Sequence, residues 1–152
     1  MNMTELFQEL KIDEDLWPFM EHYHDWLIEN IEQIHASEMI LVSPDGYAGT
    51  TDMHAKLRAN GKDAIVDYKT QNVRSKPVFY DKFVEQLVAY RNCFPNASAM
   101  ECVSVIIDSN QPAPCVQKKW SKKEVAAAET VFNASLQIWQ ASKKYKPEGG
   151  EG

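Results

Sequence analysis

Alternating side chains mark residues 47–57 as a β-strand. One face carries Tyr47, Gly49, Thr51, Met53, Ala55 and Leu57, and the other carries Ala48, Thr50, Asp52, His54 and Lys56, as the two-residue period of a strand requires. Asn60-Gly61 follows as a predicted type I′ turn, and residues 62–69 return as the second strand of a hairpin. This turn places Asp52 opposite Lys69 and diagonal to Asp67. His54 then faces Asp67.

Further hydrophobic patterns predict the elements around this hairpin. Helices are expected at 4–10, 14–34 and 79–92, and a capping box at Ser121–Glu124 opens another. Short strands are expected at 39–42, 103–108 and 114–120. The last helix carries an apolar stripe that we expect in the core, formed by Val125, Ala128, Phe132, Leu136 and Trp139. The elements together predict an α/β fold, a small mixed sheet flanked by helices, in one domain over residues 1–145 with a disordered tail at 146–152.

Two carboxylates and a lysine share one face of the predicted hairpin. Cross-strand neighbours are about 5 Å apart and diagonal ones about 7–8 Å, so Asp52 and Asp67 are close enough to share a cation. Mg²⁺ or Mn²⁺ suits them, because these ions take carboxylate oxygens and keep several waters. Such an ion activates water and neutralises charge on a phosphate, and Lys69 would assist the attacking water. The alternative is an ordinary surface hairpin with an Asp52–Lys69 ion pair worth about 0.2–1 kcal/mol.

Three motifs follow one another in this segment, Gly46–Asp52, Ile65–Thr70 and Gln86–Tyr90. They resemble the "GyaGtiD", "ivDyKT" and "QlaaY" motifs of the RecB-like branch of the PD-(D/E)XK nuclease superfamily, which includes the lambda-exonuclease-like enzymes. The resemblance implies a restriction-endonuclease-like core with catalytic residues Asp52, Asp67, Lys69 and Glu38. It implies metal ligation by the two aspartates and the Tyr68 carbonyl, and substrate contacts from Gln86, Tyr90, Thr70, Arg74 and Lys76.

The sequence departs from that family pattern in one respect, because it lacks the early histidine motif. Many members place a metal-binding histidine in a Gly-Thr-x-x-His motif on an early helix, and no segment of the sequence matches it. His24 falls on the apolar face of the predicted 14–34 helix, with Trp17 and Leu27, whereas His22 points to solvent. His24 is therefore the candidate metal ligand, with a packed structural histidine as the more frequent alternative.

Charge is distributed unevenly along the chain. The net charge is −6, but residues 1–55 contribute −11, residues 56–91 contribute +4 and residues 92–152 contribute +1. The basic residues of the middle segment are Lys56, Arg58, Lys62, Lys69, Arg74, Lys76, Lys82 and Arg91. They either track phosphates or form an ordinary solvated surface. Three cysteines without a Cys-x-x-Cys indicate reduced thiols and argue against an iron–sulfur nuclease.

The sequence thus predicts a Mg²⁺- or Mn²⁺-dependent deoxyribonuclease. The resemblance points to an exonuclease of phage or bacterial recombination or repair that acts on single- or double-stranded DNA. The further partners expected are other copies of the chain, in a homo-oligomer, or a recombination or repair protein. No apolar run approaches a membrane span, and the expected location is the cytoplasm of a bacterial cell or phage-infected host. The alternative is an inactive nuclease-fold module that binds nucleic acid or a protein.

Overall fold

The computed structural model describes residues 2–147, and these contain one five-stranded mixed sheet in the order β1-β2-β3-β4-β5. The strands are β1 (Ile31–Ser43), β2 (Tyr47–Leu57), β3 (Asp63–Gln71), β4 (Glu101–Asp108) and β5 (Val116–Lys119). The helices are α1 (Met3–Glu9), α2 (Trp17–Asn30), α3 (Asp81–Arg91) and α4 (Lys122–Lys143), with 3₁₀ turns at Glu14–Leu16 and Ala97–Ala99. Neighbouring strands are antiparallel except β3 and β4, which are parallel and joined through α3. The predicted α/β class is confirmed.

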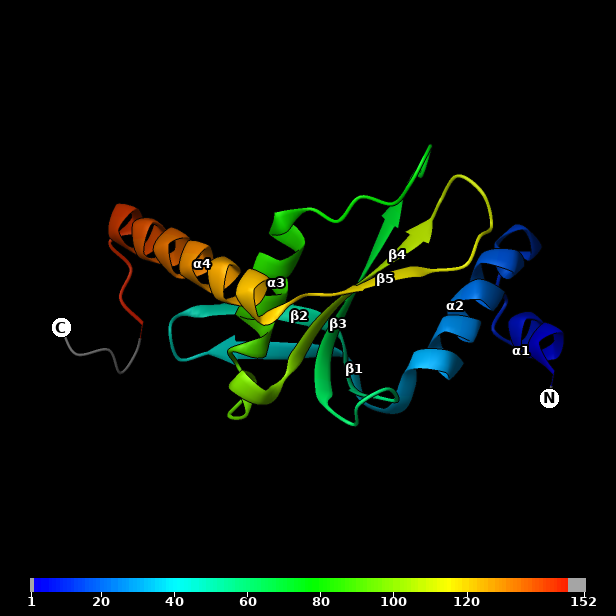
Figure 1. The fold of residues 1–152 in the computed structure, drawn as a ribbon, viewed down its shortest axis with the longest axis horizontal. Coiled ribbons are helices and arrows are strands. Elements are labelled where there is room, and N and C mark those ends of the chain that lie inside the picture. Colours follow the sequence, from blue (N-terminus) through cyan, green and yellow to red (C-terminus); the bar gives the residue numbers. More distant parts are fainter. Residues whose placement is uncertain (1, 148–152) are drawn as a thin grey trace.

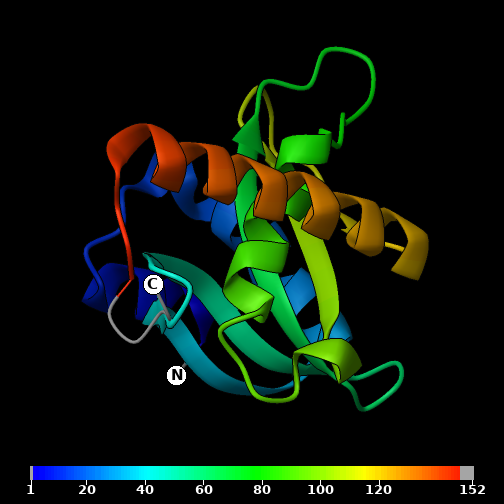
Figure 2. The ribbon, with the colours of Figure 1, turned by 90° about the vertical axis from the view of Figure 1, so that its left-hand side faces the viewer.

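Helices cover both faces of the sheet (Figures 1 and 2). Ile65 of β3 faces α3 and α4, within a core cluster that contains Leu87, Val88 and Val125. Its neighbour Val66 faces the other way and packs with Trp26 of α2. Figure 2 shows α3 and α4 in front of the sheet and the blue N-terminal helices behind it. Burial of both faces explains why Ala64–Val66 of β3 and Cys102–Ile107 of β4 are almost entirely apolar.

The predicted helix over 14–34 is too long at its C-terminal end. The helix ends at Asn30, and Ile31 adopts extended backbone angles at the start of β1. The strand that the sequence predicts at 39–42 is in fact the end of this 13-residue strand. The first eight residues of β1 are mostly polar and exposed, because β1 is the edge strand, so they lack the alternation that would predict a strand. Their extended conformation comes from pairing with β2, which overrides the local helical pattern.

Two predicted apolar stripes are partly wrong. On α2 Trp26 is buried, whereas Leu27, which is expected on the apolar face, is only partly buried. On α4, Val125 and Ala128 are buried as predicted, but Trp139 is 46% exposed. Figure 1 shows the cause for α4, whose C-terminal half extends beyond α3 and the centre of the sheet. The capping box predicted for α4 is confirmed, with reciprocal contacts between Ser121 and Glu124.

The hairpin forms, but its turn and register differ from the prediction. Leu57 N donates to Lys62 O at 2.9 Å, so four residues form the loop. Gly61 has a positive φ and Asn60 does not, so the type I′ geometry is absent. Instead the Asn60 side chain accepts from Lys62 N at 3.0 Å, as in an Asx turn.

The pairing is therefore displaced by two residues along β3. Met53 pairs with Val66 and His54 with Ile65, so the predicted pairing of His54 with Asp67 is wrong, as is that of Asp52 with Lys69. A shift by an even number of residues keeps every side chain on its predicted face. The same register continued by one position places Asp52 opposite Asp67, immediately beyond the last paired residues, in place of the diagonal arrangement that the sequence predicts.

The predicted tail at 146–152 lies mostly outside the described residues, because the structure describes it only as far as Pro147. A single domain over 1–145 stays a prediction. Within the described part of the chain, no helix has the length and apolar character needed to cross a membrane.

Candidate functional site

The candidate site lies where β2 and β3 separate. Their hydrogen-bonded pairing ends at Met53 and Val66. Beyond this point β2 continues along β1 as far as Tyr47, and β3 continues along β4 as far as Gln71. Asp52 and Asp67 are the first residues past the last pair, so the divergence of the two strands opens space between them.

Asp67 is a buried carboxylate with a charged neighbour on each side. The residue is 4% exposed, and its Oδ2 forms an ion pair with Lys69 Nζ at 2.7 Å. Burial and contact with Asp52 raise the pKa of Asp67 to about 6, although Lys69 opposes the shift. The three groups carry one more negative than positive charge when both carboxylates are ionised, so the site favours an added cation.

Backbone groups of Tyr68 also face this gap. Tyr68 N donates to Asp52 Oδ2 at 2.8 Å, so a side chain replaces the missing strand partner. In an extended strand the N–H and C=O of one residue point to the same side. The Tyr68 carbonyl therefore points toward Asp52 as well, which is the direction that its predicted role as a metal ligand requires.

A chain of hydrogen bonds connects Lys69 to α3. Lys69 Nζ donates to Gln86 Oε1 at 2.8 Å, and Gln86 Nε2 donates to Tyr90 Oη at 2.9 Å. Gln86 and Tyr90 are one helical turn apart and share a face, as their spacing predicts. A Cβ on Gly49 of β2 would lie only 2.7 Å from Tyr90 Cε1. The Tyr90 ring therefore packs directly on the backbone of β2 at Gly49, the second glycine of the Gly46–Asp52 motif.

Glu38 enters the site from β1. The register of β1 and β2 is uniform from Ser37 to Ser43 and places Glu38 opposite Asp52. Its φ of 50° lies in the left-handed region that non-glycine residues rarely occupy. Glu38 and Asp52 line a cavity of about 370 Å³ together with Tyr23, Ser37, Met53 and Tyr68.

Tyr23 of α2 is a member of this cavity that the sequence pattern does not single out. Its hydroxyl donates to Tyr68 Oη at 3.0 Å, and the two rings meet edge to face. A helical position facing the sheet is the only sequence signal for Tyr23. That signal is shared with every core residue of α2, so it carries no functional information.

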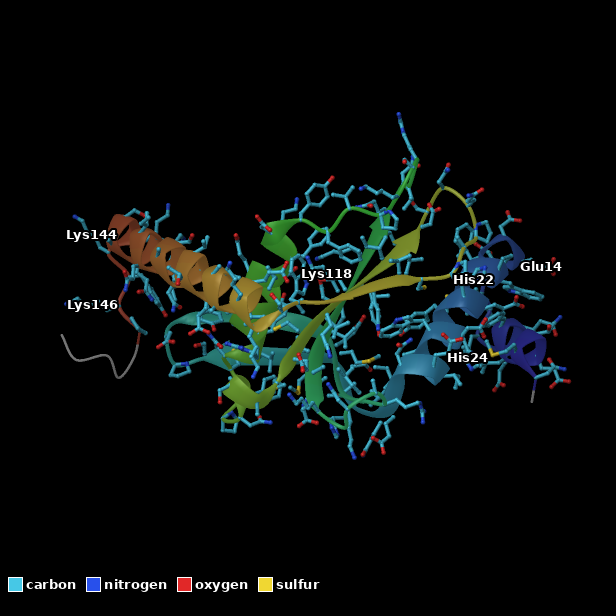
Figure 3. The ribbon with its side chains drawn as sticks, in the orientation of Figure 1. Glu14, His22, His24, Lys118, Lys144 and Lys146 are labelled. Carbon is cyan, nitrogen blue, oxygen red and sulfur yellow. The ribbon has the colours of Figure 1, made fainter. Side chains whose placement is uncertain are left out.

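The early histidines are not brought to the aspartates. Figure 3 shows His22 and His24 on α2, whose apolar side covers the sheet face opposite to α3. The His24 side chain is 43% exposed and its nearest acidic partner is Asp25, with 3.9 Å between Nδ1 and Oδ1. Nothing in the described structure joins His24 to Asp52 or Asp67, so its role as a ligand has no support from the geometry.

Half of the basic residues in the middle segment form ion pairs, including Lys69 with Asp67. Arg91 is buried and binds Glu129 at 2.6 Å, Lys56 pairs with Glu32, and Lys62 pairs with Glu101. Arg74 and Lys76 lie exposed on the loop after β3, and Thr70 is exposed near the end of that strand. The exposed basic residues without an ion pair are therefore fewer than the sequence suggests, namely Arg58, Arg74, Lys76 and Lys82, and two of them lie on that loop.

Comparison with models of known protein families and with curated proteins gives no match for this chain.

Proposed function

We propose that the protein is a metal-dependent nuclease that hydrolyses phosphodiester bonds in DNA. The observation that carries the proposal is the convergence of Asp52, Asp67 and Lys69 where two strands diverge. Lys69 donates a hydrogen bond to Gln86, which in turn donates one to Tyr90. Two carboxylates and an ammonium group are the set that a metal-assisted attack of water on phosphate requires.

The residues present fit a Mg²⁺ or Mn²⁺ ion. Asp67 is a buried carboxylate whose pKa is raised by burial and by the neighbouring Asp52, and a bound cation would favour its ionised form. Asp52 and the backbone carbonyl of Tyr68 offer further oxygen atoms on the same side, and hard divalent ions prefer such oxygen ligands. When bound, the ion would supply charge neutralisation at the phosphate and lower the pKa of a coordinated water.

The side chains around the carboxylates have separate tasks in this proposal. Lys69 places a positive charge where negative charge develops on the phosphate. Gln86 holds the lysine in position through the 2.8 Å hydrogen bond, and Tyr90 in turn orients Gln86. Arg74 and Lys76, on the loop beside the end of β3, would contact the phosphates of the bound strand.

Cleavage of end-labelled linear DNA tests the proposal. Single- and double-stranded substrates are incubated with Mg²⁺, Mn²⁺ or EDTA, and the wild type is compared with Lys69→Ala. We expect metal-dependent cleavage that falls by at least about a hundredfold in Lys69→Ala, the scale for loss of one charge-stabilising group. Lys123→Ala removes an exposed lysine from the first turn of α4 and serves as the matched control. The label released distinguishes an exonuclease from an endonuclease.

A folded wild type that cuts neither substrate with either metal would overturn the proposal. The alternative is then a binding module without catalysis. One observation favours it: Lys69 already neutralises Asp67 through a direct ion pair. Retention of labelled DNA in a filter-binding assay, without cleavage, would support that alternative.

A further inference from the structure

A second group of metal-ligating side chains lies outside the proposed nuclease site. His35 of β1, His54 of β2 and Asp63 of β3 each place one ligand atom within 4.8 Å of the other two. Among the described residues this is the one group of three or more histidine, cysteine or acidic side chains with that property. The cluster joins three neighbouring strands at the end of the sheet near the 58–61 loop.

The geometry of the cluster is close to that of a metal site. His35 Nε2 lies 2.9 Å from Asp63 Oδ1, and His54 Nε2 lies 3.8 Å from Asp63 Oδ2. The two imidazole rings are 4.7 Å apart between centroids. An ion at about 2.0–2.2 Å from each ligand would need movements of about an ångström in exposed or half-buried side chains.

His54 contributes the observation that points to a ligand. Its Nε2 is buried and has no hydrogen-bond partner, because the 3.8 Å to Asp63 is too long. A buried ring nitrogen without a partner costs free energy unless something else binds it. Phe94 also packs against the His54 ring, with centroids 4.7 Å apart, which restricts the movement of the imidazole.

A β-bulge brings the third ligand into reach. The register of β1 against β2 shifts by one residue between Ile34 and Ala36, which leaves His35 as the extra residue. Bulges redirect side chains and are frequent beside functional sites. In a regular strand His35 would point away from the sheet face that Ala36 shares with His54, its pairing partner.

We propose that His35, His54 and Asp63 form a binding site for a divalent transition metal ion of the Zn²⁺ class. Two imidazoles and one carboxylate are borderline ligands that favour such an ion over Mg²⁺. Three protein ligands leave a fourth position for water, which the exposure of His35 allows. The site is independent of the nuclease proposal, since none of its ligands belongs to the Asp52–Asp67–Lys69 group.

Zinc titration of the intact chain, by calorimetry with Zn²⁺ alone and by absorbance with Co²⁺, tests the site. We expect one equivalent of Zn²⁺ to bind and to raise the Tm. His35→Gln and His54→Gln should each lower the affinity at least about tenfold, the minimum that even an indirect partner of a metal site contributes. His24→Gln is the matched control on α2, and circular dichroism verifies that each variant folds. His35 is exposed at a bulge, so its variant tests the site even if His54→Gln fails to fold.

Two further measurements separate this site from other zinc-binding groups. Asp67→Asn should leave Zn²⁺ affinity unchanged, and the Co²⁺ spectrum should lack the charge-transfer band of a thiolate ligand such as Cys93. Loss of Zn²⁺ binding in Asp67→Asn but not in His35→Gln would overturn the proposal, as would a thiolate band. Absence of stoichiometric Zn²⁺ binding to the wild type would reduce the cluster to a histidine–aspartate hydrogen-bond network.

Discussion

Replacement of Asp67 by asparagine should stabilise the protein while removing the proposed activity. Burial and the neighbouring Asp52 raise the pKa of Asp67 from 3.8 to about 6. One pKa unit corresponds to about 1.4 kcal/mol, so ionisation of this carboxylate costs the folded state about 3 kcal/mol. Asparagine has nearly the same shape and carries no charge, so the substitution removes this cost.

The sign of the effect follows from proton linkage. The folded state binds the Asp67 proton more tightly than the unfolded state, so its contribution to stability is complete below about pH 4. That contribution is lost as the pH rises through about 6. In EDTA at pH 8 we expect Asp67→Asn to exceed the wild type in free energy of unfolding by up to about 3 kcal/mol. The difference should vanish below about pH 4.

Urea unfolding at several pH values, followed by circular dichroism, measures this difference. Asp15→Asn, which removes an exposed carboxylate from the first 3₁₀ turn, is the control and should show no comparable gain. Addition of Mg²⁺ should then stabilise the wild type, by about 2.7 kcal/mol at a hundred times the Kd, but not Asp67→Asn. A variant less stable than the wild type at pH 8 in EDTA would refute the claim that ionised Asp67 is destabilising.

Two other substitutions test contacts that support the site. Gly49→Ala places a methyl group 2.7 Å from the Tyr90 ring, so we expect a loss of about 1–3 kcal/mol in urea unfolding from overpacking and weaker DNA cleavage as Tyr90 shifts. Unchanged stability and cleavage would show that the ring moves freely. Arg91→Met leaves Glu129 without its 2.6 Å partner and should cost up to about 1 kcal/mol, because the Glu129 side chain is 41% exposed and solvent screens the ion pair. Glu129→Gln in the same background should recover part of that loss, and no recovery would contradict an ionic link between α3 and α4.

Short-range periodicity accounts for what the sequence predicts correctly at the site. Asp67 and Lys69 are two residues apart on a strand and therefore share a face. Gln86 and Tyr90 are four apart on a helix and therefore share one too. Both relations hold in the structure, because each depends only on the geometry of one element.

The errors arise where two elements must be aligned. The register of the hairpin depends on the turn. The hydrogen bond that Lys62 N donates to the Asn60 side chain stabilises a four-residue loop, which the Asn-Gly dipeptide alone does not reveal. The position of His35 depends on a bulge in β1, which has no local sequence signature. Trp139 fits the apolar period of α4, but the helix extends past the part of the sheet that could cover it.

The amide of Tyr68 has an unusual source of protection from solvent exchange. In a regular sheet an amide is released when a neighbouring strand opens. Here the acceptor is the carboxylate of Asp52, at 2.8 Å. Exchange at this one backbone position therefore reports on the rotation of a single side chain. The exchange rate of the Tyr68 amide therefore shows whether the Asp52 carboxylate accepts the backbone hydrogen bond or instead binds an ion.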